Sequence, residues 1–284
     1  MSPLGERPVV AIAPAGADLR ADIVRAVGVA GGFERVLAKS RDVLVKPNFN
    51  TGHPPPASSD PVFVKTVIEL LYEHGAAHVV LGETSMVSVS TRRTLERTGM
   101  MDAALQARAE VVCFEDEPWV RVDTSGRYLR RIRFARRALE AHSVVYLPCL
   151  KTHARADFTA SLKLTMGFAH PRDRIGLHLG RLRRKLADLN LVVAPDLIVL
   201  DGRRCFITGG PFAGTVREPN LVLASTDRVA FDVEAARIIQ SYPGNSLRGS
   251  PWRLGMIKRA VELGLGARGD EDYEVVRLNA KEAS

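Results

Sequence analysis

The chain of 284 residues is 46% hydrophobic and 25% charged, a balance that is typical of a folded globular protein and excludes intrinsic disorder. Its net charge of +8 favours anionic partners without choosing among nucleic acid, acidic membrane surfaces and small anions. No apolar run approaches the roughly 20 residues that span a bilayer, and no secretory signal is evident, so we expect no membrane segment and a cytoplasmic location.

The first part of the chain alternates short β-rich runs with helical stretches. Asp60, Pro61 and Gly75 are the N-cap, first-turn and stop signals of a helix whose apolar residues recur at helical spacing. The pattern predicts strands at residues 8–13, 42–48, 78–83 and 110–114, and helices at 18–30 and 60–74.

Residues 115–140 interrupt this alternation. They are typical of a β-hairpin that turns at residues 124–126, with a second arm that leads towards a helix. Beyond them we expect a basic helix within residues 176–190, which His178 opens and which continues through Lys185. A further helix is expected at 227–240, with Thr226 or Asp227 as its cap. The further strands are expected at residues 143–149, 196–202, 220–225 and 273–278.

The β-α-β alternation predicts an α/β fold, with a mostly parallel open sheet, helices on both faces and an inserted β-hairpin. We expect a single α/β domain over residues 1–279, followed by a short polar tail at 280–284. The pattern leaves open whether the hairpin covers a cleft or meets a second subunit in a homodimer.

Polar residues stand where several predicted strands end, and ligands of open α/β sheets bind beyond the carboxyl ends of the strands. Residues two apart on extended backbone face the same way, so Lys46 with Asn48, and Lys151 with His153, should each present a pair to one side. Ammonium, amide and imidazole groups suit a carboxylate or a phosphate, and we expect a small anionic molecule. The alternative interpretation is that these strand ends are polar only because they reach solvent. The substrate-binding candidates are Lys46, Asn48, Ser85, Asp201, Gly209 and Gly210.

Two residues are candidates for proton transfer. His153 is the first, because imidazole titrates near neutrality and a nearby lysine would lower its pKa. Lys163 is the second, because a partly buried lysine can lose its proton and act as a base or form a Schiff base. A surface-loop histidine and a lysine that extends from an amphipathic helix are the alternatives. We place Lys151 with them as the third catalytic candidate.

The stretch "DGRRCFITGGPFAGT" at residues 201–215 lacks the lysine of a phosphate-binding loop and leads into a strand. Gly209 and Gly210 are therefore interpreted as a tight turn or a point of close backbone approach. No G-x-G-x-x-G fingerprint follows the first strand, so no nucleotide cofactor is favoured.

Metal and nucleic acid remain alternatives. Cys113, Cys149 and Cys205 each lie at or just beyond the end of a predicted strand. If the three thiolates met there, they would hold an iron–sulfur cluster. The alternative is that the cysteines are small hydrophobic residues buried in the core. Asp232 is a weak candidate ligand for a divalent metal. The stretch "RYLRRIRFARR" at 127–137 combines arginines with Tyr128 and Phe134, as in single-strand binders, although charged edge strands also prevent aggregation. We rank nucleic acid below the enzyme.

The chain resembles the domain of unknown function 362 family. The matching pieces come in the family's order over roughly residues 40–240: "VLVKPN", "DPVFVKTVIELLYEHGA", "VVLGETS", "LPCLKTH", "SLKLTMGF", "DLIVLDG", "GGPFAG" and "ASTDRVAFDVEAA". The resemblance implies that Lys46, Asn48, Lys151, His153, Lys163, Asp201 and Asp232 occupy recurrent polar positions of the family. It implies no reaction. Many members carry ferredoxin-type cysteine clusters, and this chain departs from that pattern.

These observations favour a small-molecule metabolic enzyme that uses lysine and histidine for acid–base chemistry on an anionic or enolisable substrate. Isomerisation, elimination and dehydration fit this set of side chains without a cofactor. Asp201 or Asp232 would orient a base or bind a metal. An iron–sulfur or metal-dependent oxidoreductase is the first alternative, and a basic nucleic-acid-binding protein is the second.

Overall fold

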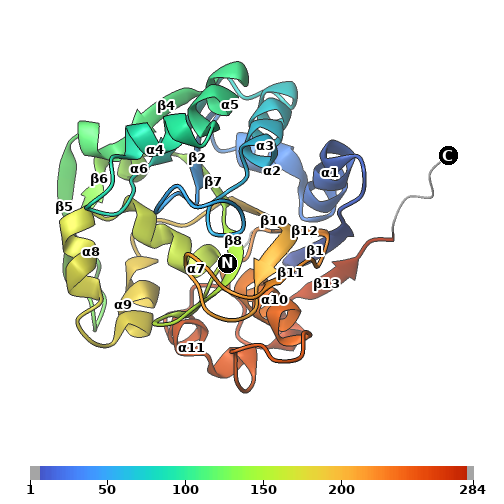
Figure 1. Cartoon of the computed structure of the whole chain (residues 1–284), viewed down its shortest axis with the longest axis vertical. Helices are drawn as coiled ribbons and strands as arrows, with labels where there is room; N and C mark the ends of the chain where they lie inside the picture. The colour runs from blue at the N-terminus through green and yellow to red at the C-terminus, as the bar shows by residue number, and fades with distance from the viewer. Residues whose placement is uncertain (1–6, 280–284) are drawn as a thin grey trace.

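The computed structural model describes residues 7–279, and these residues build a twisted mixed sheet of eleven strands (Figure 1). The expected polar tail at 280–284 lies outside the described residues. The strands of the main sheet are β1 (Val9–Pro14), β2 (Asp42–Pro47), β3 (His78–Glu83), β4 (Glu110–Cys113), β7 (Ser143–Leu147), β8 (Cys149–His153), β9 (Asp157–Thr159), β10 (Leu197–Phe206), β11 (Val216–Arg217), β12 (Leu221–Ser225) and β13 (Glu274–Arg277).

Helices cover both faces of this sheet, so the expected α/β architecture is confirmed (Figure 1). No helix within residues 7–279 has the length and apolar content that a membrane crossing requires. The α-helices are α1 (Leu19–Val29), α2 (Gly32–Leu37), α3 (Pro61–Glu73), α4 (Thr91–Arg97), α5 (Met100–Gln106), α6 (Arg136–Glu140), α7 (Ser161–Leu164), α8 (Pro171–Leu177), α9 (Leu182–Leu189), α10 (Arg228–Gln240) and α11 (Gly255–Glu262). Short 3-10 turns lie at η1 (Phe114–Asp116), η2 (Thr165–Phe168), η3 (Pro251–Arg253) and η4 (Asp270–Asp272).

The strand order through the sheet is β13-β1-β12-β10-β7-β2-β3-β4, with β8 beside β10 and β9 beside β8. Strands β10, β7, β2, β3 and β4 all run parallel, which confirms the expected mostly parallel sheet. Strand β12 is antiparallel to both of its neighbours, β1 and β10. No helix connects β10 to β12, and a chain that returns without a crossover helix must pair antiparallel.

The central strands are buried on both sides because their alternate residues enter two different cores. Val43 and Val45 of β2 pack with helices α1, α3 and α5 on one face. Leu44 between them packs with α7, α9 and α10 on the other face. This explains why β2 and β3 are continuous apolar runs in the sequence rather than alternating ones. Polar side chains at the carboxyl ends of β2 and β3 can therefore occur only beyond the two hydrophobic cores.

Side-chain caps fix where two long helices begin. The Asp60 carboxylate accepts hydrogen bonds from the N–H groups of Val62 and Phe63 at 2.8 and 3.1 Å, as the sequence indicates for α3. Of the two expected caps for α10, Asp227 is the one used, and it accepts from the N–H groups of the next turn. Such caps typically stabilise a helix by about 1 kcal/mol.

The expected basic helix at 176–190 is wrong as a single element. His178 ends α8 instead of opening a helix, and the chain restarts as α9 at Leu182. Gly180 and Arg181 between them have φ values of 70° and 55°. Left-handed residues cannot continue a right-handed helix, so they break it at this point.

The inserted hairpin is present and forms a two-stranded sheet of β5 (Trp119–Asp123) and β6 (Arg131–Ala135). Its connection is longer than the expected turn and runs over residues 124–130. The Asp188 carboxylate of α9 accepts from the N–H groups of Tyr128 and Leu129, and Arg133 forms an ion pair of 2.5 Å with Asp173 of α8. The hairpin is thus fastened to α8 and α9.

Gly82 of β3 provides a test of this packing. A Cβ atom there would lie 2.5 Å from the Phe114 ring and 2.9 Å from Leu44 Cδ1, both in a closed core. Because overpacking a core forces side chains off their rotamers, Gly82→Ala should lower the free energy of unfolding in urea by about 1–3 kcal/mol. Gly28→Ala in α1 is the matched control, since nothing lies within 4 Å of its Cβ position, and it should leave stability unchanged or raise it. Equal effects of the two substitutions would contradict this packing.

Candidate functional site

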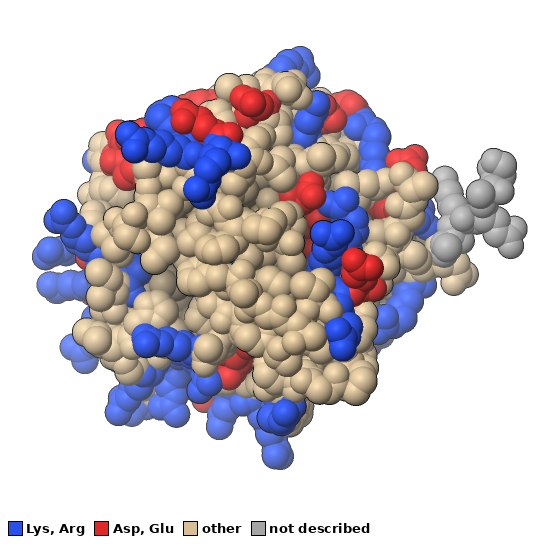
Figure 2. Space-filling model, viewed as in Figure 1, with Lys and Arg blue, Asp and Glu red and all other residues tan. Residues whose placement is uncertain are grey.

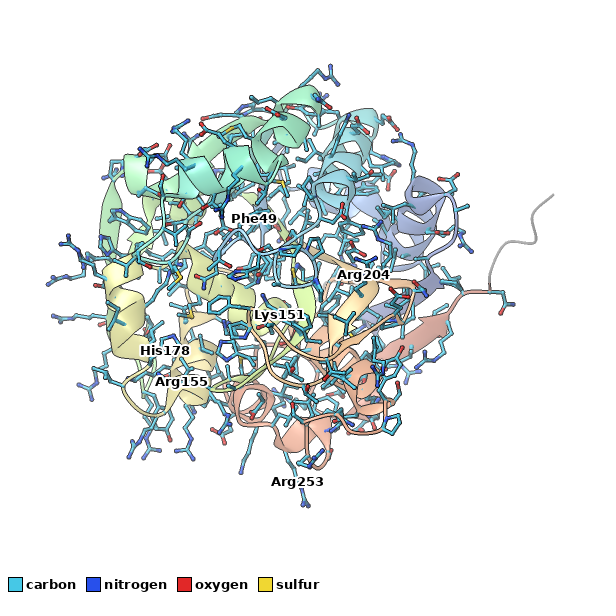
Figure 3. All side chains as sticks on the ribbon, in the orientation of Figure 1. Phe49, Lys151, Arg155, His178, Arg204 and Arg253 are labelled. Carbon is cyan, nitrogen blue, oxygen red and sulfur yellow. The ribbon has the colours of Figure 1, made fainter. Side chains whose placement is uncertain are left out.

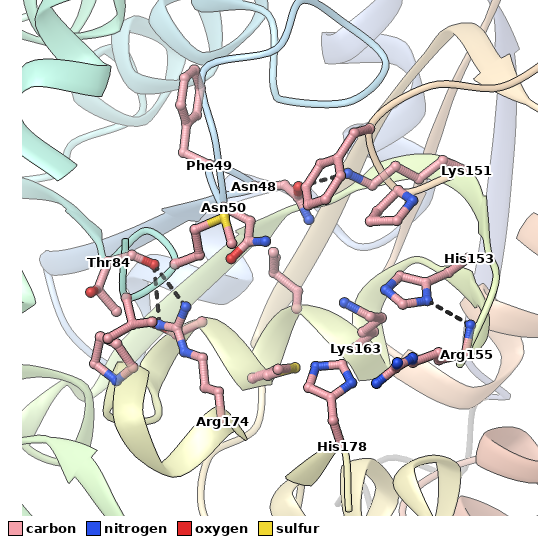
Figure 4. Close-up of a pocket in the computed structure, with 18 of the residues that line it drawn as sticks. Asn48, Phe49, Asn50, Thr84, Lys151, His153, Arg155, Lys163, Arg174 and His178 are labelled. Carbon is pink, nitrogen blue, oxygen red and sulfur yellow. Dashed lines mark hydrogen bonds between the residues drawn. The ribbon is translucent and has the colours of Figure 1, made fainter. Parts of the chain in front are cut away.

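The carboxyl ends of β2, β3 and β8 open onto a cavity of about 530 Å³ (Figure 4). Basic and amide side chains from four parts of the chain point into it, and none of the described residues that line it is acidic. The polar residues are Lys46, Asn48 and Asn50 from β2 and its loop, Thr84 after β3, Lys151, His153 and Arg155 from β8 and its loop, Lys163 of α7, and Arg174 and His178 of α8.

Apolar side chains form the rest of the wall. They come from the loops after β2 and β3, from the α7–α8 region and from the loop after β10. The apolar lining residues include Phe49, Met86, Val87, Leu164, Met166, Ile175, Pro211 and Phe212. A cavity of this size, mostly apolar with a few convergent polar groups, is typical of a small-molecule site.

Lys46 is held in a buried ion pair instead of facing a ligand as a free cation. Its ammonium group lies 2.6 Å from Glu83 Oε1 and donates to the Pro47 carbonyl at 2.7 Å. The Glu83 carboxylate also accepts from the N–H groups of Phe49 and Thr84, each at 2.8 Å. Burial lowers the pKa of Lys46, and the adjacent carboxylate opposes that shift. Lys46 therefore holds the floor of the cavity.

Arg174 serves a similar purpose in the wall of the cavity. Its buried guanidinium donates to the carbonyl groups of Thr84, Gly167 and Ala169, at distances between 2.8 and 3.1 Å. These bonds join the end of β3 to the segment that leads into α8. Burial lowers its pKa to about 10, so the group stays charged at neutral pH and makes the cavity more positive.

Lys151 is the cation that Asn48 positions. Its ammonium donates to Asn48 Oδ1 at 3.2 Å and to the Ala57 carbonyl. An ammonium group has three donors, so one remains for a ligand. Burial lowers the pKa of Lys151, and no carboxylate offsets that loss of hydration. A bound anion would restore the favourable charge interaction.

His153 is neutral, and the structure fixes which nitrogen carries its proton. Its Nδ1 atom accepts from the backbone N–H groups of Arg155 and Ala156 at 3.1 and 3.2 Å (Figure 4). A nitrogen that accepts two N–H donors has no proton, so the proton is on Nε2. Burial, with the nearby charges of Lys163 and Lys151, lowers the pKa of His153 to about 2. The lowered pKa argues against His153 as a base at neutral pH, and its Nε2–H group is left as a hydrogen-bond donor.

Lys163 faces the cavity from α7, between His153 and His178 (Figure 4). Part of its side chain is exposed to the cavity, and its amine has no hydrogen bond or ion pair within residues 7–279. Burial, followed by the charges of Lys151 and Arg174, lowers its pKa to about 7. At neutral pH a large share of this amine is thus unprotonated, which is the state that a general base needs.

Asp232 does not line the cavity, but it binds the backbone of the short helix α7 that carries Lys163. Its carboxylate in α10 accepts from the N–H groups of Ser161 and Leu162 at 2.8 and 3.2 Å, which are the first residues of α7. Complete burial raises its pKa to about 8. The expectation that Asp232 is a metal ligand is replaced by a structural role, since it fixes the short helix that carries Lys163.

Four other predicted residues lie outside the cavity. Ser85 is buried, and its hydroxyl donates to the Phe49 carbonyl at 2.8 Å. Asp201 is inside β10 instead of at its end, because that strand continues to Phe206, and it pairs with Arg203 at 2.6 Å in a separate cavity of about 350 Å³. Gly209 and Gly210 form the turn that precedes the lining residues Pro211 and Phe212.

Gly210 is a point of close backbone approach, as expected. A Cβ atom on it would lie 1.8 Å from the Thr152 carbonyl oxygen of β8, and its φ of 67° is in the left-handed region. Only glycine allows this loop to lie against the strand that carries Lys151 and His153. Its role is therefore to bring Phe212 over the cavity.

The three cysteines do not meet. Cys113 is at the end of β4, four strands from Cys205 in β10, which corresponds to about 19 Å across the sheet. Burial raises the pKa of Cys149 to about 11 and that of the other two thiols to about 12, which disfavours thiolates. Within residues 7–279 no three His, Cys, Asp or Glu side chains gather as metal ligands. These residues do not fit an iron–sulfur cluster.

Sequence reasoning missed Arg174, Arg155 and His178 as residues of the cavity. Arg174 is one of several arginines in a basic stretch, and nothing in the local pattern separates the buried one from its exposed neighbours. Glu83 is one of the polar residues at the predicted strand ends, but its pairing with Lys46 of the neighbouring strand was missed. Its charge would have suggested a counter-ion for that lysine.

The Lys46–Glu83 pair can be tested by breaking it. Because Glu83→Ala leaves a buried ammonium without a counter-charge, it should lower the free energy of unfolding by about 3–5 kcal/mol in urea titrations. The half-exposed pair Lys65–Glu69, 3.9 Å apart on α3, is the control, and Glu69→Ala should cost less than about 0.5 kcal/mol. A small effect at Glu83 would show that the pair does not hold the cavity floor.

Three comparisons place the chain among known proteins. It is 28% identical over 242 residues to the thylakoid-associated protein sll1697 of Synechocystis sp., a match that covers 82% of this chain and 74% of the relative. Its structure is similar to that of the lactate racemase apoprotein from Thermoanaerobacterium thermosaccharolyticum, with a TM-score of 0.50 and 12% identity. That match covers 83% of this chain and 57% of the racemase chain, so the chain spans little more than half of that protein, and it shows a shared fold.

The family match spans the strands and loops that build the cavity. The model of the domain of unknown function 362 matches residues 43–237, from the start of β2 almost to the end of α10. Lys46, Asn48, Lys151, His153 and Lys163 all lie within that range. The chain belongs to the DUF362 family.

Proposed function

We propose that the protein is an enzyme that moves a proton at the carbon next to a carboxylate or carbonyl group of a small anionic substrate. Isomerisation and elimination are the reaction types that this chemistry gives. The observation that carries the proposal is Lys163. Its amine has no partner among the described residues and has a pKa of about 7, inside a cavity that is otherwise lined by cations, amides and apolar groups.

The anionic end of the substrate belongs at Lys151 and Asn48. Lys151 has one donor left after its bonds to Asn48 and Ala57, and the Asn48 amide nitrogen has no hydrogen bond within residues 7–279. A carboxylate placed there accepts from both groups, and charge-assisted bonds of this kind are about twice as strong as neutral ones. The absence of acidic lining groups among the described residues favours an anion over a cation.

Proton transfer needs a base and a group that stabilises the developing oxyanion. Unprotonated Lys163 takes the proton from the substrate carbon and becomes an ammonium group beside the enolate. His153 donates its Nε2 proton as a hydrogen bond, as a neutral imidazole can do without becoming charged. Lys163 then returns the proton to the far carbon of an enolate that is conjugated with a second double bond, which moves that double bond, or to a hydroxide that departs from the β-carbon and leaves as water.

The structural neighbour supports this class of reaction by analogy. A lactate racemase is an isomerase of a small hydroxycarboxylate, and its apoprotein shares the fold of this chain. Many unrelated activities can occur on one fold, so the argument depends on the cavity and uses the neighbour only as support.

Hydrogen exchange at carbon tests the proposal without knowledge of the product. In D₂O, wild-type protein should exchange the α-proton of at least one member of a panel of small hydroxy- and oxocarboxylates, followed by ¹H NMR. Lys163→Met, which removes the base but keeps the side-chain length, should slow exchange by about 10²–10⁴-fold. Lys151→Met should instead raise the substrate concentration that half-saturates the exchange rate, because it removes the carboxylate partner.

Lys258→Met is the control for those variants, because Lys258 is exposed on α11, away from the cavity, and should exchange at the wild-type rate. Equal rates for wild type and Lys163→Met would refute the assignment of Lys163 as the base. Loss of cooperative unfolding in Lys163→Met would point to a structural role instead.

The pKa of Lys163 sets the expected pH dependence. Because the unprotonated amine is the base, the exchange rate should rise with pH and level off above about 7. Between pH 7 and the ordinary lysine value of 10.5, the unfolded chain binds a proton at Lys163 that the folded chain does not. Stability should therefore rise with pH in that window, and Lys163→Met should remove that component.

Trace acetylation with acetic anhydride, resolved by mass spectrometry, measures the same pKa without any substrate. The labelling midpoint of Lys163 should be near pH 7, and the exposed Lys258, labelled in the same sample, is the internal reference. A midpoint above about 9 at Lys163 would contradict a base at neutral pH.

A further inference from the structure

An arginine-lined groove adjoins the candidate site. It has a volume of about 580 Å³, and its polar lining residues are Arg155, His178, Arg181, Arg183 and Arg184. Arg155 and His178 also line the 530 Å³ cavity, so the two spaces meet at these side chains. Figure 3 shows Arg155 and His178 next to each other on the side of the cavity away from Phe49.

The groove lies on the most basic side of the face shown in Figure 2, where Lys and Arg gather along the left and lower edges around α8, α9 and α11. None of the described residues that line it is acidic. Four guanidinium groups in one groove repel each other, and a folded protein tolerates this more readily when an anion offsets it.

Internal contacts account for only part of this charge. Arg183 forms an ion pair of 2.7 Å with Asp157, and Arg184 donates to the Tyr128 hydroxyl at 2.9 Å. The guanidinium of Arg155 has no hydrogen bond or ion pair within residues 7–279, and that of Arg181 only lies over the Tyr128 ring at 5.6 Å. Two of the four cations, Arg155 and Arg181, thus remain available to a ligand.

The backbone at the groove is also unusual. Arg181 adopts a left-handed φ of 55°, directly after Gly180 at 70°, and this pair ends the helical path between α8 and α9. A non-glycine residue in this region costs on the order of 1 kcal/mol. The break turns the chain so that Arg181 and Leu182 line the groove instead of continuing a helix, and α9 begins there without a side-chain cap.

The aromatic residues of this region argue against nucleic acid as the ligand. Stacking of bases needs exposed ring faces. The Tyr128 ring has four arginine guanidinium groups within 5.0 to 5.6 Å, and Phe134 is fully buried. The arginines could still bind phosphates, but the rings of Tyr128 and Phe134 are already covered by other side chains and offer no free face for a base to stack on.

We infer that the substrate of the cavity carries a phosphate or polyphosphate tail, which passes Arg155 and His178 and binds in the arginine groove. A guanidinium group binds phosphate oxygens through two parallel hydrogen bonds. Several guanidinium groups together offer more hydrogen-bond donors than a single carboxylate can accept. The position of the reacting end rests on the proposed function, whereas binding of the phosphate rests on the groove alone.

Inorganic pyrophosphate tests the groove directly. Isothermal titration calorimetry should show that it binds wild-type protein, and that Arg155→Gln and Arg181→Gln each weaken binding by about tenfold, since each removes one charge-assisted contact. Arg93→Gln, at an exposed position on α4, should bind as wild type. Lys163→Met should also bind as wild type, so loss of proton exchange in that variant leaves the groove untouched.

A linear ω-phosphonoalkanoate tests whether one ligand occupies both spaces. It should bind more tightly than pyrophosphate or than the unsubstituted alkanoate, and it should lose affinity in both Lys151→Met and Arg155→Gln. Undiminished pyrophosphate binding in both arginine variants would overturn the inference. So would a single-stranded RNA of about twelve nucleotides, spanning a typical single-strand site, that displaces pyrophosphate at lower concentration than the phosphonoalkanoate does.

Discussion

The buried ion pair between Lys46 and Glu83 is the constraint on which the rest of the site depends. It joins the carboxyl ends of β2 and β3 in a place where neither charge reaches solvent. Burying two charges is costly unless their other hydrogen-bonding positions are filled, and here backbone groups fill them on both sides. The Glu83 carboxylate thereby determines the course of both loops that line the cavity. The pair also restricts Gly167, where a Cβ would lie 2.6 Å from Lys46 Nζ.

Three lysines of one cavity illustrate how surroundings assign different roles to the same side chain. Lys46 has a carboxylate partner and remains part of the framework. Lys151 has an amide oxygen and a carbonyl as partners, so its ammonium group has one donor left for an anion. Lys163 has no partner among the described residues, and burial, followed by two nearby cations, favours its neutral form. Burial, followed by the charges of Lys163 and Lys151, lowers the pKa of His153, so the histidine is the hydrogen-bond donor and the lysine is the base.

Supporting contacts from distant parts of the chain hold these groups in place. Asp232 of α10 caps α7 beneath Lys163, and Arg174 of α8 binds the backbone at the end of β3. The break between α8 and α9 then opens the arginine groove beside His178. A rigid cationic cavity and a more open cationic groove thus share one wall, which suits a ligand with a small reacting end and a larger charged end.

Local patterns in the sequence determined the secondary structure, the mostly parallel sheet and the two strand ends that carry Lys46 with Asn48 and Lys151 with His153. Those features depend on side-chain alternation and helix caps within a few residues, so they can be recognised from neighbouring positions alone. The break at Gly180 and Arg181 escaped this reasoning because the arginine gives no local sign of a left-handed conformation.

Only the tertiary structure decided which polar groups meet and in what state of charge. It paired Lys46 with Glu83, placed Asp201 in a different cavity, moved Asp232 beneath α7 and separated the three cysteines. These outcomes depend on strand order and on contacts between residues far apart in the chain. Burial and neighbouring charges then set each pKa, and neither is a property of the residue type or of its local sequence.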